Sequence, residues 1–143
     1  MYRKILVGID PTHEEEGPRA LKEALRVLDT DGQVIMFTVV SPPEQPFYPV
    51  IREIDLDGAK ADAERALEVM IRKEAPRGID VVSIVAVGKA ARSLLQTAEG
   101  SGADLIVLTE HGHLWPLRRD TVQYVCQHAA CPVLVLPTPA DED

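Results

Sequence analysis

The stretch Asp104-Leu105-Ile106-Val107-Leu108-Thr109 decides the fold class, because its four central residues are apolar without interruption. A strand with one face in solvent alternates apolar and polar residues, and this stretch has no such alternation. Strands that are buried on both faces are typical of parallel sheets covered by helices on each side. Polar residues follow from Glu110 onward, so we expect the strand to end at Thr109.

The same kind of strand recurs on both sides of this stretch. Continuous apolar runs cover residues 4–9, 34–40 and 133–136, which we also expect to be buried on both faces, and residues 80–87 are rich in valine and isoleucine. Between these runs, apolar residues recur every three or four positions, which predicts helices. The helical segments start after Pro18, span Leu56 to Met70 and Ala91 to Ala98, and run from about Asp120 or Thr121 to His128.

This alternation of strands and helices predicts a doubly wound α/β fold, because parallel neighbours require right-handed crossover connections. We expect a single domain over residues 1–143, with a five-stranded parallel sheet in the order 3-2-1-4-5 and helices on both faces. The proline-rich stretch 41–54 fits neither a helix nor a central strand, so we expect a long loop there. A lid over a site, a cover over the core and a partner contact remain open for this loop.

The composition excludes several classes of protein. The chain has 143 residues, with 15 Lys and Arg against 23 Asp and Glu, and its formal net charge is −8. An acidic chain without a run of basic residues is not expected to bind nucleic acid or an anionic membrane. Neither a membrane-spanning stretch nor a secretory signal is evident, which predicts a cytoplasmic location. Cys126 and Cys131 fit neither a disulfide framework nor a four-ligand zinc site, and we expect buried thiols.

The predicted topology also indicates where a ligand would bind. Ligands of open parallel sheets bind beyond the carboxyl ends of the strands, where the strand order reverses. Here that point lies between the first and fourth strands, so that the loop Asp10-Pro11-Thr12 and the loop after Thr109 converge. Asp10 is placed to accept hydrogen bonds from a ribose or another polyol. The alternative is that Asp10 caps the turn or helix that follows it.

Several stretches, in order and spacing, resemble the universal stress protein family. They are Val7-Gly8-Ile9-Asp10, residues 34–39, Gly88 before a helix, Asp104 to Gly112, and Tyr124 to Val135 with Cys131-Pro132-Val133-Leu134-Val135 at its end. The resemblance runs nearly end to end and implies an adenine nucleotide alpha hydrolase-like fold and a small regulatory domain of the stress response. It also implies a homodimer that forms through the last strand, Cys131 to Leu136. We expect this strand at the sheet edge, where unpaired backbone groups need covering.

ATP-binding members of that family carry the pattern Gly-x2-Gly-x9-Gly-Ser/Thr after the fourth strand, and this chain matches it in part. Thr109 stands at the first glycine position and Asp120 at the third, whereas Gly112 and Thr121 keep the pattern; seven residues separate Gly112 from Asp120. Thr109 adds a side chain where the backbone of a phosphate loop approaches its ligand. Asp120 adds a carboxylate beside the phosphates, and one such like-charge contact costs about 4 kcal/mol at about 4 Å and an effective dielectric near 20.

Residue by residue, the resemblance implies an adenine-nucleotide site. Asp10, within the loop that includes Pro11 and Thr12, holds the ribose, and Val39 contacts the adenine. Gly112, Arg118, Arg119, Thr121 and the amide of Val122 contact the phosphates, and Thr109 is also expected among the binding residues, with Mg²⁺ only if a nucleotide is bound. Two roles remain open for Arg118 and Arg119, which either clamp the phosphates or stay solvated and pair with Asp120.

No residue pattern predicts catalysis or a resident metal ion. Ser93, Ser101 and Cys126 have no evident activating base, and the pair His111 and His113 lacks a third defined ligand. We therefore expect no enzyme, and two functions remain. One is a sensing domain that binds ATP or another adenine nucleotide. The other is a dimeric module that binds an unknown protein partner, with Trp115 as a plug of the phosphate site or an anchor for that partner.

Overall fold

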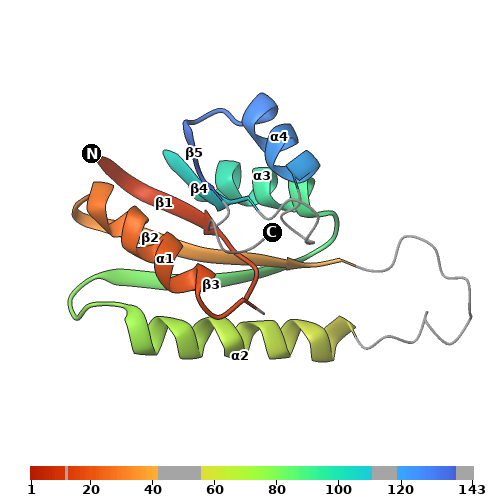
Figure 1. Cartoon of the computed structure of the whole chain (residues 1–143), viewed down its shortest axis with the longest axis horizontal. Helices are drawn as coiled ribbons and strands as arrows, with labels where there is room; N and C mark the ends of the chain where they lie inside the picture. Colours follow the sequence, from red (N-terminus) through yellow and green to blue (C-terminus); the bar gives the residue numbers. More distant parts are fainter. Residues whose placement is uncertain (12, 42–55, 111–118, 138–143) are drawn as a thin grey trace, which may run out of the picture.

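A parallel sheet of five strands runs through the part of the chain that the computed structural model describes, which is residues 1–11, 13–41, 56–110 and 119–137 (Figure 1). Its strand order is β3-β2-β1-β4-β5, which confirms the predicted fold class and topology. The elements in chain order are β1 (Tyr2–Gly8), α1 (Glu16–Val27), β2 (Leu28–Val40), α2 (Leu56–Glu74), β3 (Asp80–Val87), α3 (Ala90–Ser101), β4 (Leu105–Thr109), α4 (Arg119–His128) and β5 (Val133–Leu136).

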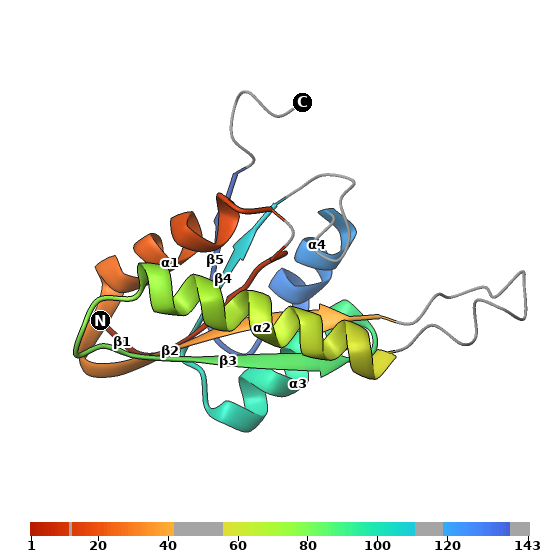
Figure 2. The same cartoon turned by 90° about the horizontal axis from the view of Figure 1, so that it is seen from below.

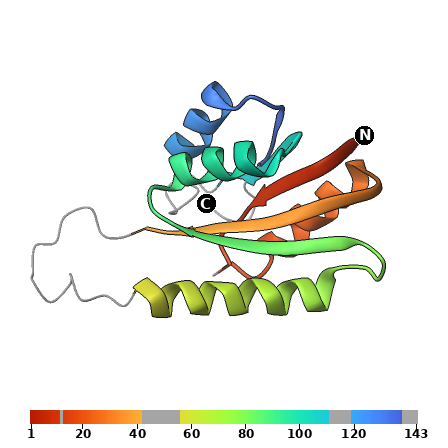
Figure 3. The same cartoon turned by 180° about the vertical axis from the view of Figure 1, so that it is seen from behind.

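Helices cover both faces of the sheet. The odd-numbered residues Ile5 and Val7 of β1 pack with α1 and α2 in one core cluster, whereas Leu6 packs with α3 and α4 in the other. Figure 2 views the molecule from the side of α2, and Figure 3 shows α3 and α4 on the opposite side of the sheet. Because successive side chains of a strand point to opposite faces, an uninterrupted apolar run fills both clusters.

The register brings the carboxyl ends of β1 and β4 to nearly the same level, while β2 continues past them to Val40. Gly8 of β1 lies opposite Phe37 of β2 and opposite Leu108 of β4. The backbone continues this alignment beyond β1, since the amide of Ile9 donates to the carbonyl oxygen of Phe37 at 2.9 Å. The segment after β1 and the ends of β2 and β4 therefore share one edge of the sheet.

The structure differs from the prediction at two strands. We predicted a second strand from Val34, but β2 begins at Leu28, directly after α1. Residues 29–33 are polar and therefore gave no strand pattern in the sequence. In this extension Leu28 pairs with Tyr2, and Asp31 has a positive φ of 65°. The expected burial of β5 on both faces was wrong, because β5 is at the sheet edge and its Leu134 is 36% exposed.

The prediction of two buried thiols was also wrong. Cys126 is exposed on α4, and Cys131 is only half-buried. The helix turns Val122 and Val125 toward the sheet, and the residue after Val125 faces outward. None of the helices in the described residues combines the length and the apolar character needed to cross a membrane. Most of the proline-rich stretch (residues 42–54) and the predicted anchor Trp115 lie outside the described residues.

Candidate functional site

A pocket of about 410 Å³ opens at the carboxyl ends of β1 and β2. Asp10, which is 7% exposed, and Pro11 reach it from the segment after β1, and Val39 reaches it from β2. These three residues were predicted to contact one ligand, and the structure brings them together. The pocket is lined by Asp10, Pro11, Thr38, Val39, Val40, Ser41, Ala59, Asp62, Ala63 and Ala66.

The helix α2 forms the opposite wall, and the sequence pattern did not indicate this. Ala59, Ala63 and Ala66 lie on one face of α2, and the same face carries the carboxylate of Asp62. The spacing of the alanines was interpreted as a stripe that packs against the sheet. Their small size was the available signal, because alanine fills less space than the leucines of a tightly packed helix and leaves room beside the sheet.

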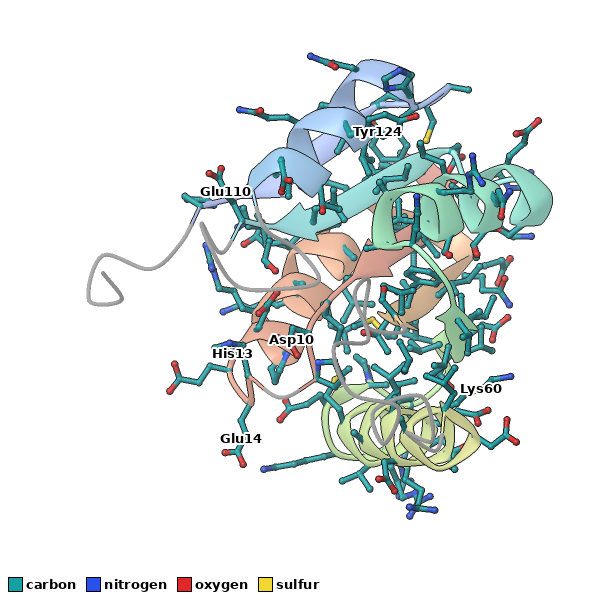
Figure 4. The ribbon with its side chains drawn as sticks, turned by 90° about the vertical axis from the view of Figure 1, so that its right-hand side faces the viewer. Asp10, His13, Glu14, Lys60, Glu110 and Tyr124 are labelled. Carbon is teal, nitrogen blue, oxygen red and sulfur yellow. The ribbon has the colours of Figure 1, made fainter. Side chains whose placement is uncertain are left out.

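Asp10 is not the N-cap of the following helix. The helix α1 begins at Glu16, and the residue at its N-cap is Glu15, which makes no capping hydrogen bond with its side chain. In the turn between, the amide of His13 donates to the carbonyl oxygen of Asp10 at 3.1 Å. The Asp10 carboxylate instead lines the pocket. Figure 4 shows Asp10 and His13 close together on this turn.

The charges of this pocket favour ligands that donate hydrogen bonds. Asp10 and Asp62 both line it, but the Asp62 side chain is 73% exposed and paired with Arg65, so the buried carboxylate of the pocket is that of Asp10. An ionised carboxylate accepts hydrogen bonds and donates none, so hydroxyl and amino groups are its natural partners. Pro11 and the short side chains of Ala59 and Ala63 give the pocket apolar walls, whereas the Val39 side chain packs in the core cluster on the α3 and α4 face of the sheet. This combination is suited to a nucleoside better than to its phosphates.

The expected phosphate site lies at the start of α4, and a carboxylate of the chain lies there. The amide of Thr121 donates to the Oδ1 atom of Asp120 at 3.0 Å. Asp120 therefore lies at the positive end of the α4 dipole, where a phosphate would bind. The side chain of Val122 packs into the core and leaves only its backbone for a ligand. Thr12, Gly112 and Arg118 lie outside the described residues, and so does the side chain of Arg119.

Thr109 is in the position predicted from the sequence, at the end of β4. It is 1% exposed, and its Oγ1 atom has no hydrogen-bond partner among the described residues. Thr121 is also buried, at 9% exposure, but neither threonine lines the pocket beside Asp10. The described residues thus bring together the part of the predicted site that concerns ribose and adenine. His111 and His113 lie outside the described range, and the residues within it contain no cluster of three or more His, Cys, Asp or Glu able to hold a metal ion.

Cys131 has the properties of a structural thiol. Burial raises its pKa, and the negative charge of Asp104 raises it further, which keeps the thiol protonated at neutral pH. Asp104 itself lies at the amino end of β4, where its two carboxylate oxygens accept hydrogen bonds from the amides of Arg3 and Lys4, each at 3.0 Å. Both residues are therefore at the sheet end opposite to the pocket.

Comparison with known proteins identifies the family to which the chain is similar. The family model of the universal stress protein family matches residues 1–137. Universal stress protein UspA from Lactobacillus plantarum is 25% identical, with 94% of this chain and 97% of that chain covered and a TM-score of 0.74. A family member from Arabidopsis thaliana with AMP bound is 18% identical, covering 97% and 94%, with a TM-score of 0.66. A universal stress protein in complex with cAMP is 21% identical, covering 96% and 98%, with a TM-score of 0.60.

The family match covers nearly the whole chain, and the strand order agrees with the order expected from the sequence. The chain belongs to the universal stress protein family.

Proposed function

We propose that this protein binds an adenine nucleotide, ATP or AMP, at the carboxyl ends of β1 and β4 and acts as a small cytoplasmic regulatory domain of the stress response. The observation that carries the proposal is the 410 Å³ pocket in which Asp10, Pro11 and Val39 meet. Small-molecule sites are clefts of about 300–1,000 Å³ with mostly apolar walls and a few polar groups. Two family members with the same fold hold AMP and cAMP, which supports an adenine ligand.

In this proposal the buried carboxylate of Asp10 accepts hydrogen bonds from the two ribose hydroxyls. The adenine lies against the backbone of Val39 at the end of β2, since the Val39 side chain packs on the α3 and α4 face of the sheet, and the short side chains of Ala59 and Ala63 leave space for the ring beside α2. The phosphates extend toward the start of α4, where the amide of Val122 and the hydroxyl of Thr121 are the predicted donors among the described residues. No catalytic step is part of the proposal.

Isothermal titration with AMP, ADP and ATP, with and without Mg²⁺, tests this assignment. Removing the Asp10 charge in Asp10→Asn is expected to weaken binding at least tenfold, since a hydrogen bond to a charged group is worth about 1.5–3 kcal/mol. Asp57→Asn is the matched control, because Asp57 is exposed on α2 and lies outside the pocket lining. The absence of binding heat at millimolar nucleotide would refute the proposal.

A second pair of variants tests the wall of the pocket. Ala59→Leu adds bulk inside the pocket and is expected to weaken binding, whereas Ala61→Leu adds the same bulk outside the pocket lining. Equal effects of the two leucines would mean that the ligand binds elsewhere.

The second candidate function is a dimeric protein-interaction module, and the edge of the sheet favours it. Among the described residues β5 pairs with β4 alone, and Leu134 on β5 is 36% exposed. An apolar edge strand invites pairing with a second copy. Light scattering at micromolar concentration is expected to give a dimer that Leu134→Lys dissociates. Val82→Lys is the matched control, since Val82 is 37% exposed on β3 at the other edge; a monomeric wild type would refute this part.

A further inference from the structure

A groove, here called the α1–α2 groove, runs along the two helices on the face of the sheet that both of them cover (Figure 2). It consists of two pockets, of about 550 and 510 Å³, which share Pro18 and Glu74 in their linings. The helices come close at Gly17, where a Cβ atom would lie 3.3 Å from two side-chain atoms of Met70. Each pocket alone falls within the range of about 300–1,000 Å³ that is typical of small-molecule sites.

The 510 Å³ part of the groove has mainly apolar walls. The buried side chains of Ile9 and Leu67 contribute to its lining, and Met70 lines it from α2. Val69 lines it as well, although this side chain is 58% exposed to solvent. A ligand that covers Val69 gains stability in proportion to the apolar area that it removes from water. This part of the groove is therefore suited to a hydrocarbon chain.

Basic side chains predominate in the 550 Å³ part of the groove. Those that line it from α1 are Arg19, Lys22 and Arg26. Their spacing of three and four residues places them along one face of the helix, and Glu74 of α2 is the acidic residue of this lining. Arg26 pairs with Glu23, whereas Lys22 makes no ion pair with the described residues. Lys22 is therefore available to an anion.

The charge of the whole groove is opposite in sign to that of the chain. The charged residues that line the 510 Å³ part are Arg65, Lys73, Glu14 and Glu74. Over both parts the described residues supply five basic and two acidic side chains, because Glu74 is shared. Arg65 pairs with Asp62, but Lys73 makes no ion pair within the described part of the chain. Although the formal net charge of the chain is −8, the local field of the groove favours an anion.

We propose that the α1–α2 groove is a second binding site, which takes an amphipathic anion made of a hydrocarbon chain and a terminal carboxylate. The chain lies against Val69 and Met70, and the carboxylate pairs with Lys22. A small polar anion would leave Val69 in water, and a neutral hydrocarbon would leave Lys22 without a partner. The site is distinct from the nucleotide pocket, because neither Asp10 nor Val39 lines the groove.

Isothermal titration of the nucleotide-free protein with hexanoate, octanoate and decanoate, each below its micelle concentration, tests this proposal. We expect one site per chain, with an affinity that rises about fivefold for every two added carbons, because an open groove buries part of each methylene. Decyltrimethylammonium has the same chain with a cationic end, and we expect it to bind about tenfold more weakly than decanoate. Absence of binding heat at millimolar decanoate, or equal binding of the anion and the cation, would overturn the proposal.

Two variants with matched controls locate the site. Lys22→Glu is expected to weaken decanoate binding about fivefold, and Val69→Asp about tenfold, because Val69→Asp also places a charge against the hydrocarbon. The controls are Lys89→Glu and Val87→Asp, since both residues are exposed and neither lines the groove. All four positions are on the surface, so urea unfolding should show that each variant folds. Equal losses in the groove variants and their controls would overturn the proposal, whatever the outcome of the nucleotide titrations.

Discussion

Asp104 ties the start of β4 to the start of β1, and this contact makes a pH-dependent contribution to stability. Its carboxylate accepts hydrogen bonds from the amides of Arg3 and Lys4, each at 3.0 Å. Burial raises the pKa of Asp104, but these backbone hydrogen bonds outweigh it, and the net pKa lies below the ordinary value of 3.8. A carboxyl whose pKa is lower in the folded state stabilises the fold above the unfolded pKa. That stabilisation is lost as the pH falls through the folded pKa.

The variant Asp104→Asn removes the charge and leaves one acceptor oxygen for two amides. A hydrogen bond to a charged group contributes about 1.5–3 kcal/mol, and partial exposure reduces this value. We therefore expect Asp104→Asn to lower the free energy of unfolding by about 1–2 kcal/mol at pH 7. The difference from wild type should shrink below pH 3.8, where the wild-type carboxyl also becomes neutral.

Urea unfolding at pH 7 and pH 3 measures this difference. Asp31→Asn is the matched control, since Asp31 is exposed and its φ of 65° lies in a region that asparagine tolerates. If Asp104→Asn costs the same at both pH values, the charge of the carboxylate does not carry the effect. If Asp31→Asn costs as much at pH 7, the two amide contacts contribute nothing specific.

Three further outcomes follow from burial. Leu67→Ala empties a fully buried position on α2 and is expected to cost about 2–5 kcal/mol in urea unfolding; a cost below 1 kcal/mol would contradict the packing of α2. Thr109→Val replaces a buried hydroxyl without a hydrogen-bond partner in the described part of the chain, so unfolding should show unchanged or higher stability, and a clear loss would reveal a partner. A thiol reagent at pH 8 should modify the exposed Cys126 faster than Cys131, whose pKa burial raises, and the reverse order would refute the placement of α4.

The sequence patterns predicted the fold because burial on both faces requires unbroken apolar runs, and such runs are visible without a structure. They also placed Asp10 near the predicted site, since residues at the ends of parallel strands meet at one edge of the sheet, whereas the place of Val39 was implied by the family resemblance. They did not locate the α2 wall, because Ala59, Ala63 and Asp62 also fit an amphipathic helix that packs on the sheet. The proximity of His13 to Asp10 depends on the path of one turn, which no periodicity records.

In the proposed site, the placement of carboxylates predicts an order of affinity among adenine nucleotides. Asp10 and Asp62 line the pocket, and Asp120 accepts the amide of Thr121 at the start of α4. Each added phosphate brings more negative charge toward Asp120, in a chain whose formal net charge is already −8. With glycine at the position of Asp120, each added phosphate would increase the affinity for the nucleotide. In the proposed site, affinity should therefore fall from AMP to ATP in the absence of Mg²⁺, and Asp120→Gly should reduce or reverse that order. Tighter binding of ATP than of AMP to the wild type would mean that the phosphates avoid the start of α4.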